Sequence, residues 1–535
     1  MKKLMSILLV VLMLIPFIAS CGGNDVTTTT EMPTTETPTT EEPTTEAPTT
    51  EAPTTEAPTT EAPTTEAPTT EAPTTEAPTT EAPSTIDPNA PWSSKTDIRD
   101  TWSGKTLNVA CSTWYATGWP WAMPETVITE ENDANFGPII QNAVFDRNEF
   151  IEKTYGVKVK WLNTTKANMT DELEKATLAK NVNYDLAAPR MMNVQPIVAG
   201  RYVYDLAGRE FIDFDNSYYR DESIKAYTAH GHTFFVTGGF SNLDIETASV
   251  LLFNKDLLTE EEINDIYDMV RKGEWTYDKL FNYVGASYRD DGNGFMDSND
   301  TYGMLISSFS DYYDYFGVKT AGVNQTTGQW ELTINDERID DIMSAISESV
   351  FDIGEITDWF AHYSQESLVF LEMDLAQTYA MKAENIGVVP FPMLNKEQGR
   401  YYVPCSMLYS VAMCIPKITQ DRAMSEYFLD VLCWTGDEYM MKAYIEAKKE
   451  RFKDDVDIEM LTEYIIPNIS YDVGGATVFY DDDRGTVTWA PVISINDDSY
   501  KGNKNDFDRL YEERSPEALK TIAKWNAAWG GYTEE

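Results

Sequence analysis

The sequence predicts an α/β protein whose folded part consists of two lobes. From residue 92 to residue 535 the chain mixes aromatic, aliphatic and charged residues as globular domains do, and that length exceeds one ordinary domain. Near the start of this part, strand patterns alternate with helix patterns. Such alternation favours a parallel sheet with helices packed on its faces.

Five segments carry the prediction of a parallel sheet. Residues 106–111 are typical of a buried strand, and residues 157–161 of a strand with alternating polar and apolar side chains. Apolar residues at helical spacing predict helices over 141–155 and 169–180, and residues 184–188 are typical of a third strand. Strands joined by helices run parallel with right-handed crossovers, and the ligands of such sheets lie beyond the carboxyl ends of the strands.

Residues 1–20 are expected to be a lipoprotein signal peptide. Lys2 and Lys3 precede an uncharged apolar run over 4–18, which is too short for a stable membrane span. The run ends in Ile18-Ala19-Ser20-Cys21, which resembles the lipobox of bacterial lipoproteins. The resemblance implies cleavage before Cys21 and a diacylglycerol on its thiol, which would anchor the mature chain to a membrane. The alternative is an ordinary secretory signal with a chance cysteine.

Residues 21–91 are expected to be a disordered tether rich in Thr, Glu, Ala and Pro. Between Pro43 and Pro83 the chain repeats Pro-Thr-Thr-Glu-Ala without a large apolar residue, so it cannot form a core. Regular prolines and repelling glutamates favour an extended chain of up to roughly 3 Å per residue, on the order of 200 Å in all. Such a tether suits a domain held away from a membrane within a thick cell wall.

Charge and cysteine content exclude several classes of protein. The chain has 88 acidic and 41 basic residues, for a formal net charge of -47, so we expect no basic surface for nucleic acid. The four cysteines beyond Cys21 form no CxxC pair, which argues against structural zinc. Cys405 and Cys414 are either buried thiols or a disulfide, and their spacing does not decide between the two. No Gly-x-Ser-x-Gly, HExxH or P-loop motif occurs.

Several segments of the folded part carry a family resemblance through their order and spacing. Residues 386–392 read Ile-Gly-Val-Val-Pro-Phe-Pro, a G-x-x-P-x-P segment, and residues 274–280 form a helix start with Thr276 as N-cap. The other segments are residues 142–148, 155–159, 184–186, 204–206, 250–258 and 410–417. Together they resemble the extracellular solute-binding proteins of carbohydrate ABC importers (bacterial family 1).

The resemblance implies a two-lobed, periplasmic-binding-protein-like (type II) fold, with parallel-rich sheets flanked by helices and a hinge between the lobes. It assigns residues 92–248 and 406–465 to lobe one, and residues 249–405 and 466–535 to lobe two. It implies a monomeric binding protein, not an enzyme, that requires no cofactor. Its implied partners are a carbohydrate, expected to be an oligosaccharide, and the permease subunits of an ABC importer. The protein would lie on the extracellular face of the cell membrane, held by its lipid anchor alone.

Sugar sites combine aromatic faces with a few charged or amide groups that bind hydroxyls. Trp114, Trp119 and Trp121 stand in a loop directly after the first strand, at the ligand end of the sheet. The other candidate ligand residues are Arg190, Asn242, Asp244, Trp359, Tyr471 and Asp472. Loop packing, surface salt bridges and turn formation would explain the same residues without a ligand. Trp525 and Trp529, four residues apart, are instead expected to pack in the core.

The loop over 290–300 resembles an EF-hand-like calcium loop that this family often carries. The resemblance implies calcium ligands at Asp291, Asn293, Phe295, Asp297 and Asp300. The first ligand position falls on a cation, Arg289, and a register change to Asp290 would restore a carboxylate there. The loop is therefore either a structural Ca²⁺ site or a solvated turn.

Two other functions remain open at the level of sequence. A cell-surface glycoside hydrolase would need a pair of carboxylates about 5–10 Å apart, and the many acidic residues do not exclude one. A stalked glycan-binding adhesin is suggested by the Thr-Pro repeat.

Overall fold

The computed structural model describes residues 100–112, 137–164, 169–180, 184–287, 289–294, 300–306, 312–349, 368–380, 383–474, 478–481, 486–489 and 504–534. The chain divides into two units between Thr79 and Thr80, and all described residues belong to the second unit. Within the described ranges, no helix combines the length and the apolar character of a membrane span.

The first sheet is parallel, as predicted. β1 (Thr106–Ser112) lies between β2 (Lys158–Thr164) and β3 (Leu186–Ala188), and both neighbours run parallel to it. β1 is buried from Val109 to Ser112, which is typical of a central strand covered on both faces. We call the part of the chain built on this sheet lobe one.

Two helices form the crossovers of this sheet, and both predictions are confirmed. α2 (Pro138–Tyr155) begins with a proline in its first turn and ends at Gly156, whose φ of 65° is the left-handed conformation that glycine adopts easily. α3 (Met169–Ala179) buries Leu173 and Ala176, three residues apart on one face. The order strand, helix, strand, helix, strand therefore follows from local patterns.

The predicted strand over 410–417 is not a continuous strand. The segment instead makes isolated bridges: Val411 with Arg190, Cys414 with Ala187, and Met413 with Val236 on the other side. Proline explains the interruption, because Pro189 and Pro416 have no N–H to donate and break a ladder. The other elements of lobe one are η5 (Met191–Asn193), α4 (Val194–Ala199), α5 (Asp221–Tyr227), β4 (Thr228–Ala229), β5 (His232–Thr233), α12 (Arg422–Gly436), the π-helical η10 (Asp437–Met441) and α13 (Lys442–Lys449).

The second sheet is mixed and carries what we call lobe two. Its order is β11 (Ile386–Val389), β6 (Ser249–Asn254), β10 (Leu368–Asp374) and β7 (Tyr302–Ile306). β6 is antiparallel to both neighbours, whereas β10 and β7 are parallel. The helices of this lobe include α7 (Glu260–Arg271), which starts with a Thr259 and Glu262 capping box, and α8 (Tyr277–Ser287).

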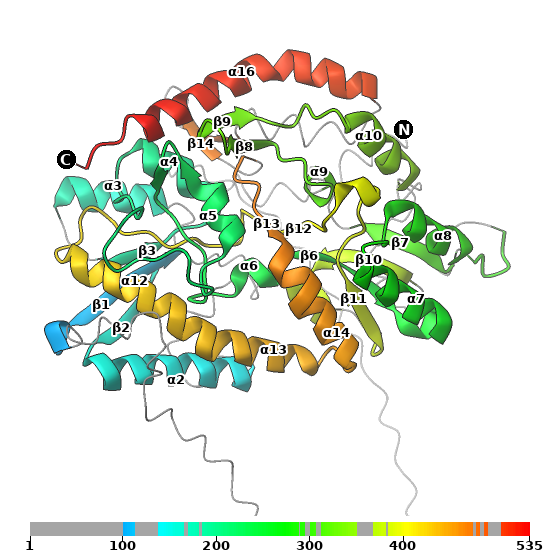
Figure 1. Cartoon of the computed structure of the whole chain (residues 1–535), viewed down its shortest axis with the longest axis horizontal. Coiled ribbons are helices and arrows are strands. Elements are labelled where there is room, and N and C mark those ends of the chain that lie inside the picture. Colours follow the sequence, from blue (N-terminus) through cyan, green and yellow to red (C-terminus); the bar gives the residue numbers. More distant parts are fainter. Residues whose placement is uncertain are drawn as a thin grey trace, which may run out of the picture. The chain divides into compact units, whose positions relative to one another are not determined.

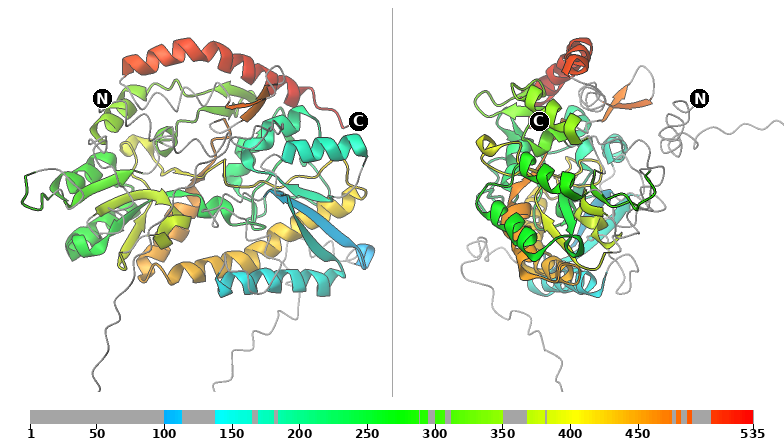
Figure 2. Two further views of the ribbon diagram at one scale, coloured as in Figure 1. Left: turned by 180° about the vertical axis from the view of Figure 1, so that it is seen from behind. Right: turned by 90° about the vertical axis from the view of Figure 1, so that its right-hand side faces the viewer.

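The remaining elements complete lobe two or connect the lobes. They are α6 (Leu243–Glu246), η6 (Lys255–Leu257), α9 (Tyr312–Tyr315), β8 (Ala321–Asn324), β9 (Gln329–Leu332), α10 (Ile339–Ser349), η8 (Leu375–Ala380), η9 (Lys396–Gln398), β12 (Val403–Pro404), α14 (Asp455–Glu459), the π-helical η11 (Met460–Ile465), η12 (Ile466–Asn468), β13 (Ile469–Ser470), β14 (Val478–Asp481), β15 (Thr486–Trp489) and α16 (Lys504–Gly530). Figure 1 shows the two sheets on either side of α6, β12 and β13, with α16 along one edge and α12 and α13 along the opposite edge. The view from behind in Figure 2 shows the same arrangement.

A charged network centred on the buried side chains of Lys255 and Asp457 fixes α14. Lys255 is 5% exposed, and its Nζ donates to Asp457 Oδ2 at 2.6 Å and to Asp454 Oδ2 at 2.7 Å. The Tyr267 hydroxyl donates to the other Asp457 oxygen. Burial raises the pKa of Asp457, and the Lys255 ammonium opposes this. The network therefore ties α14 to the second sheet.

Candidate ligand site at the crossing segments

Three segments of the chain cross side by side between the lobes. β12 pairs parallel with β13, at Val403 with Ile469 and at Pro404 with Ser470. Cys405 pairs antiparallel with Ala248, at the end of the first crossing. The Cys405 N–H also donates to the Ser470 carbonyl at 3.2 Å. Short crossing segments of this kind can act as a hinge, because small backbone rotations in them move two packed bodies relative to each other.

Hydroxyl and thiol groups pack within these crossings. The hydroxyls of Thr247 and Ser410 lie 2.6 Å apart, and both residues are fully buried. Cys405 and Cys414 are both buried, and each is a thiol that is not joined in a disulfide. Burial raises the pKa of the Cys414 thiol well above its ordinary value, which keeps the thiol protonated and unreactive.

Asp244 and Tyr471, both predicted ligand residues, lie together and bind each other. The Tyr471 hydroxyl donates to Asp244 Oδ2 at 2.8 Å and accepts from Thr237 Oγ1 at 3.3 Å. Arg220 Nε lies 3.5 Å from the same Asp244 oxygen. Burial alone would lower the pKa of Arg220, but Asp244, Tyr471 and Asp437 together outweigh it and the pKa is raised. Asp244 and Tyr471 are 3% and 4% exposed, so this pair joins the first crossing to the last one.

Of the neighbours of that pair, Asn242 is buried and Asp472 is partly buried. Asn242 is the residue before α6, and it is 2% exposed. Asp472 accepts a hydrogen bond from the Thr320 N–H at 2.8 Å, which links the last crossing to β8. Burial raises the pKa of Asp472, Asp314 adds to the rise, and Lys319 opposes it.

Arg190 stands where the sheet of lobe one meets the second crossing. It follows β3, is 7% exposed, and its Nη1 donates to the Leu408 carbonyl at 3.2 Å. Burial lowers the pKa of Arg190 to about 10. Burial and the charge of Asp374 raise the pKa of the neighbouring Tyr409, whereas the charge of Arg190 lowers it. A cation from lobe one and a carboxylate from lobe two therefore both influence the pKa of the same phenol.

Asp374 supplies the carboxylate from lobe two. It ends β10 opposite Ser249, whose hydroxyl donates to Asp374 Oδ1 at 3.1 Å, and Gln377 Nε2 lies 3.4 Å from Oδ2. Burial, reinforced by Glu372, raises the pKa of Asp374 to about 7. Sequence reasoning missed this residue because β10 itself was not predicted. The signal was present in the apolar run over 368–371.

We call Arg190, Tyr409, Asp374 and Gln377 the crossing cluster. It offers a guanidinium, a phenol, a carboxylate and an amide within the region where the lobes meet. Such a mixture of donors and acceptors suits hydroxyl groups, which both donate and accept hydrogen bonds.

The loop that resembles a calcium site brings three carboxylates together. Oxygens of Asp290, Asp291 and Asp300 lie within 4.8 Å of one another. Arg289 pairs with Thr301 through its backbone at the base of the loop, so Asp290 and not Arg289 contributes to the cluster. Asp300 is fully buried and accepts from the Asp291 N–H at 2.9 Å. Asn293, another predicted ligand, has an amide side chain and lies within the described residues. Phe295 and Asp297 lie outside the described residues.

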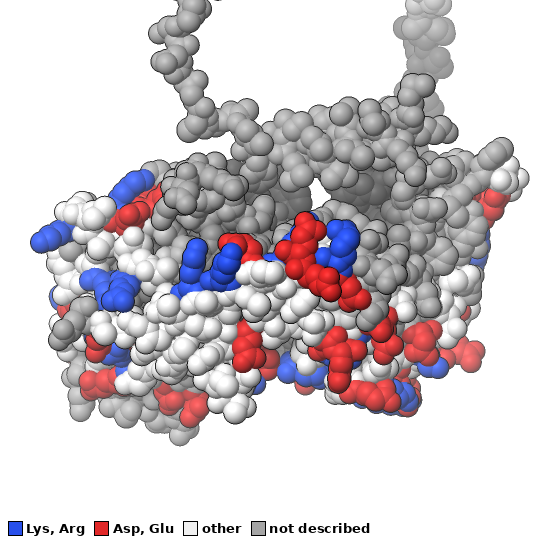
Figure 3. All heavy atoms as spheres, turned by 90° about the horizontal axis from the view of Figure 1, so that it is seen from above, with Lys and Arg blue, Asp and Glu red and all other residues white. Residues whose placement is uncertain are grey.

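The other predicted site residues also lie outside the described residues. These are Cys21 at the lipobox and the aromatic candidates Trp114, Trp119, Trp121 and Trp359. Their roles stay predictions. On the face seen in Figure 3, acidic and basic side chains of the described residues are interspersed.

Two α/β lobes joined by three crossing segments define a periplasmic-binding-protein-like (type II) fold, as predicted. The galacto-N-biose-/lacto-N-biose I-binding protein of the ABC transporter from Bifidobacterium longum, solved with lacto-N-biose, shares this fold with a TM-score of 0.50 and 12% identity. The match covers 79% of this chain and 98% of that one.

Two further structures match less closely. One is the extracellular solute-binding protein from Staphylococcus aureus in complex with maltose, at 11% identity and a TM-score of 0.47. The other is the maltose/maltodextrin-binding domain MalE from Bdellovibrio bacteriovorus bound to maltotriose, at 12% identity and a TM-score of 0.46. Each match covers 78% of this chain, and 98% and 100% of the other chain, respectively. No protein-family model and no curated protein sequence matches this chain.

Proposed function

We propose that the protein is a lipid-anchored extracellular solute-binding protein, which captures a carbohydrate between its lobes and delivers it to an ABC importer. The observation that carries the proposal is the set of three crossing segments between two α/β lobes. Such a connection lets the lobes close around a solute while each lobe keeps its own packing. The Bifidobacterium longum protein with this fold was solved with lacto-N-biose, which supports a carbohydrate as the solute.

The polar groups of the crossing cluster support a neutral, hydroxyl-rich ligand. Arg190 and Asp374 carry opposite charges, and Tyr409 and Gln377 add neutral donors and acceptors. The tryptophans after β1, Trp114, Trp119 and Trp121, would stack on sugar rings and extend the site to an oligosaccharide. Capture of this kind needs binding and release without chemistry.

A thermal-shift screen tests the proposal. Residues 22–535 are heated with lacto-N-biose, maltotriose, a sugar phosphate or a tripeptide, each at increasing concentration. A ligand that binds only the folded state adds about 2.7 kcal/mol of stability at a hundred times its Kd, so a neutral sugar should raise the midpoint by several degrees. The Arg190→Gln variant should lose that rise, and the exposed Lys272→Gln variant should keep it. A rise with the peptide and with no sugar would contradict a carbohydrate ligand.

The same protein is tested for glycoside hydrolysis. Incubation with oligosaccharides for many hours should leave their chain lengths unchanged. Release of shorter sugars, lost in carboxylate variants, would favour the hydrolase.

The anchor and the calcium ion are separate parts of the proposal. A Cys21→Ala variant should lose metabolic labelling with palmitate and should be released into the medium, because the thioether-linked lipid can no longer form. We also propose that Asp290, Asp291 and Asp300 hold a structural Ca²⁺ ion, which takes hard oxygen ligands of this kind.

A further inference from the structure

The C-terminal helix α16 is attached to both lobes. Near its start, the Phe507 ring lies 6.3 Å from the ring of Tyr313 in α9, which belongs to lobe two. Near its end, Trp529 lies 4.9 Å from Phe234 and donates from Nε1 to Gln195 Oε1 at 2.8 Å, both in lobe one. At 1.5 Å per residue, these two attachments are about 33 Å apart along the helix. Figures 1 and 2 show α16 running from α10 over β8 and β9 to α4.

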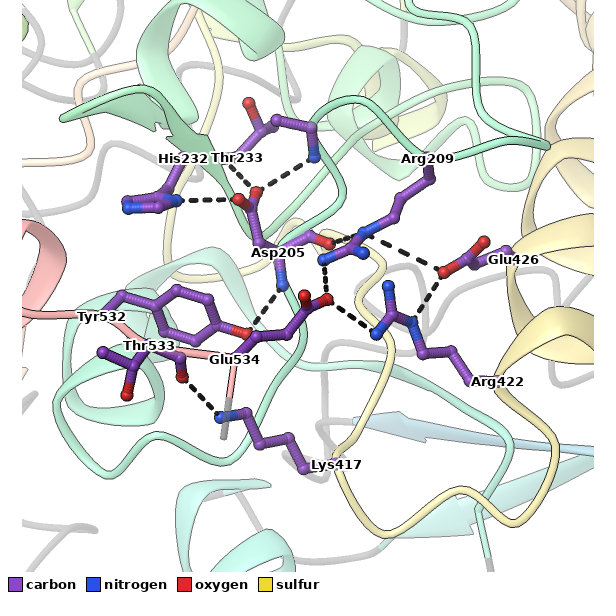
Figure 4. A network of polar contacts seen from close by, with 11 residues as sticks. Asp205, Arg209, His232, Thr233, Lys417, Arg422, Glu426, Tyr532, Thr533 and Glu534 are labelled. Carbon is purple, nitrogen blue, oxygen red and sulfur yellow. Dashed lines mark hydrogen bonds and ion pairs between the residues drawn. The ribbon is translucent and has the colours of Figure 1, made fainter.

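The tail after α16 is held by a group of cations on lobe one. Glu534 Oε1 accepts from Arg209 Nη2 at 2.6 Å and from Arg422 Nη1 at 2.7 Å (Figure 4). Lys417 Nζ donates to the Thr533 carbonyl at 3.2 Å, and Arg201 Nη2 donates to the Gly531 carbonyl at 3.1 Å. We call the contacts of these four cations with residues 531–534 the clasp.

Tyr532 adds aromatic contacts to the clasp. Its ring lies 4.7 Å from Phe234 and 5.2 Å from the ring of His232, and Lys417 Nζ lies 4.7 Å from its centroid. Its hydroxyl accepts from the Asp205 N–H at 3.2 Å. Tyr532 and Trp529 therefore contact the same phenylalanine, so the clasp fixes the last turn of α16 on lobe one.

The ion pairs of the clasp are suited to reversible release. The Glu534 side chain is 51% exposed, and those of Arg422 and Arg209 are 30% and 16% exposed. Partly exposed ion pairs are weak one by one and are screened by salt. Four cations gathered on one acidic tail also stand out in a chain with a net charge of -47.

A weak point of the helix lies between its two attachments. Pro516 stands inside α16, where it has no N–H to donate and where helices commonly bend. The same end of α16 is also attached to β9, where the Asn526 side chain binds the backbone of Trp330. If the lobes separate on this side, α16 must bend near Pro516, part from β9 or leave lobe one. The contact of Trp529 with Phe234 and the clasp both lie on the C-terminal side of Pro516.

We propose that α16 and residues 531–534 form a strap that limits the separation of the two lobes, with the clasp as its releasable end. The strap would regulate the closure that the proposed function requires, and in that sense it rests on the proposed function. It acts on the protein without ligand, so it can be tested without one.

The test measures the distance between the lobes with spin labels. Leu178→Cys in α3 of lobe one and Asn264→Cys in α7 of lobe two place labels on exposed positions, while the described native cysteines are buried. Residues 22–535 carrying both labels are compared with the same protein carrying Glu534→Gln, and with a version that ends at Gly531. Glu517→Gln is the matched control, because it breaks an exposed pair with Lys520 on the same helix.

We expect longer or broader distances in Glu534→Gln, a larger change in the shortened chain, and no change in Glu517→Gln. At 1 M salt the Debye length is about 3 Å. The label-to-label distances of the parent protein should then shift toward those of the Glu534→Gln variant, whereas the distances of the variant itself should not change. Identical distances in the parent, Glu534→Gln and the shortened chain at low salt, with circular dichroism unchanged, would overturn the strap. Because no sugar is added, a failure to bind carbohydrate would leave this result untouched.

Discussion

The carboxyl group of Asp374 should make the stability of the protein depend on pH. An aspartate in water has a pKa of about 3.9, whereas burial and Glu372 raise the pKa of Asp374 to about 7. The folded state therefore binds this proton more tightly than the unfolded state does. The contribution to the free energy of unfolding is largest below pH 4, and it is lost as pH rises through 7.

The size of the effect follows from the two pKa values. A difference of roughly 3 pKa units, at about 1.4 kcal/mol each, gives an upper limit of about 4 kcal/mol. Because the Asp374 residue is only partly buried, we expect about 2–3 kcal/mol. Asp374→Asn replaces the carboxylate by a neutral group that can still accept from Ser249. The variant should match the parent near pH 4 and should be more stable by that amount at pH 8.

Denaturant unfolding at several pH values measures this difference, with fluorescence and circular dichroism recorded together. Asp268→Asn is the control, because hydrogen bonds from Lys272 and Arg271 lower the pKa of that exposed carboxylate. Its effect should be small and of opposite sign. An Asp374→Asn variant whose stability differs from the parent by the same amount at every pH would refute the reasoning, as would a variant less stable than the parent at pH 8.

Three further predictions use other parts of the structure. Tyr471→Phe removes the hydroxyl that donates to Asp244 and should lower the free energy of unfolding by about 1–2 kcal/mol; an unchanged denaturation midpoint would contradict the pairing. Lys255→Met leaves Asp457 buried without its cation and should lower the free energy of unfolding by about 3–5 kcal/mol. Calorimetry should therefore show a lower Tm. Calcium, but not magnesium, should raise the Tm of the parent, and Asp300→Asn should abolish that rise; an equal rise in both proteins would exclude this loop as the site.

The elements of lobe one that were predicted from sequence are those with a strong local signal. The buried runs of β1 and β3, the helical spacing in α2, and the glycine that ends α2 depend on residues only a few positions apart. Trp525 and Trp529 were likewise expected in the core from their spacing, and both are buried. Parallel pairing followed from the alternation of these elements.

The candidate site was predicted less completely, because its members come from distant parts of the chain. Arg190, Asp244 and Tyr471 were singled out by their places after strands or near crossings, yet the bond between Asp244 and Tyr471 joins residues 227 positions apart. Asp374 was missed, since its strand is a short apolar run without a distinctive period.

The sequence by itself determined the order of elements from β1 to β3, the parallel sheet of lobe one, the two-lobed fold class and the acidic character of the chain. Tertiary structure alone decided that residues 410–417 pair through isolated bridges, that Asp374 meets Ser249, and that Glu534 returns to Arg209 and Arg422. The reason is physical: periodicity and capping act over a few residues, whereas these contacts form only when the packing of whole lobes brings distant backbone and charged groups together.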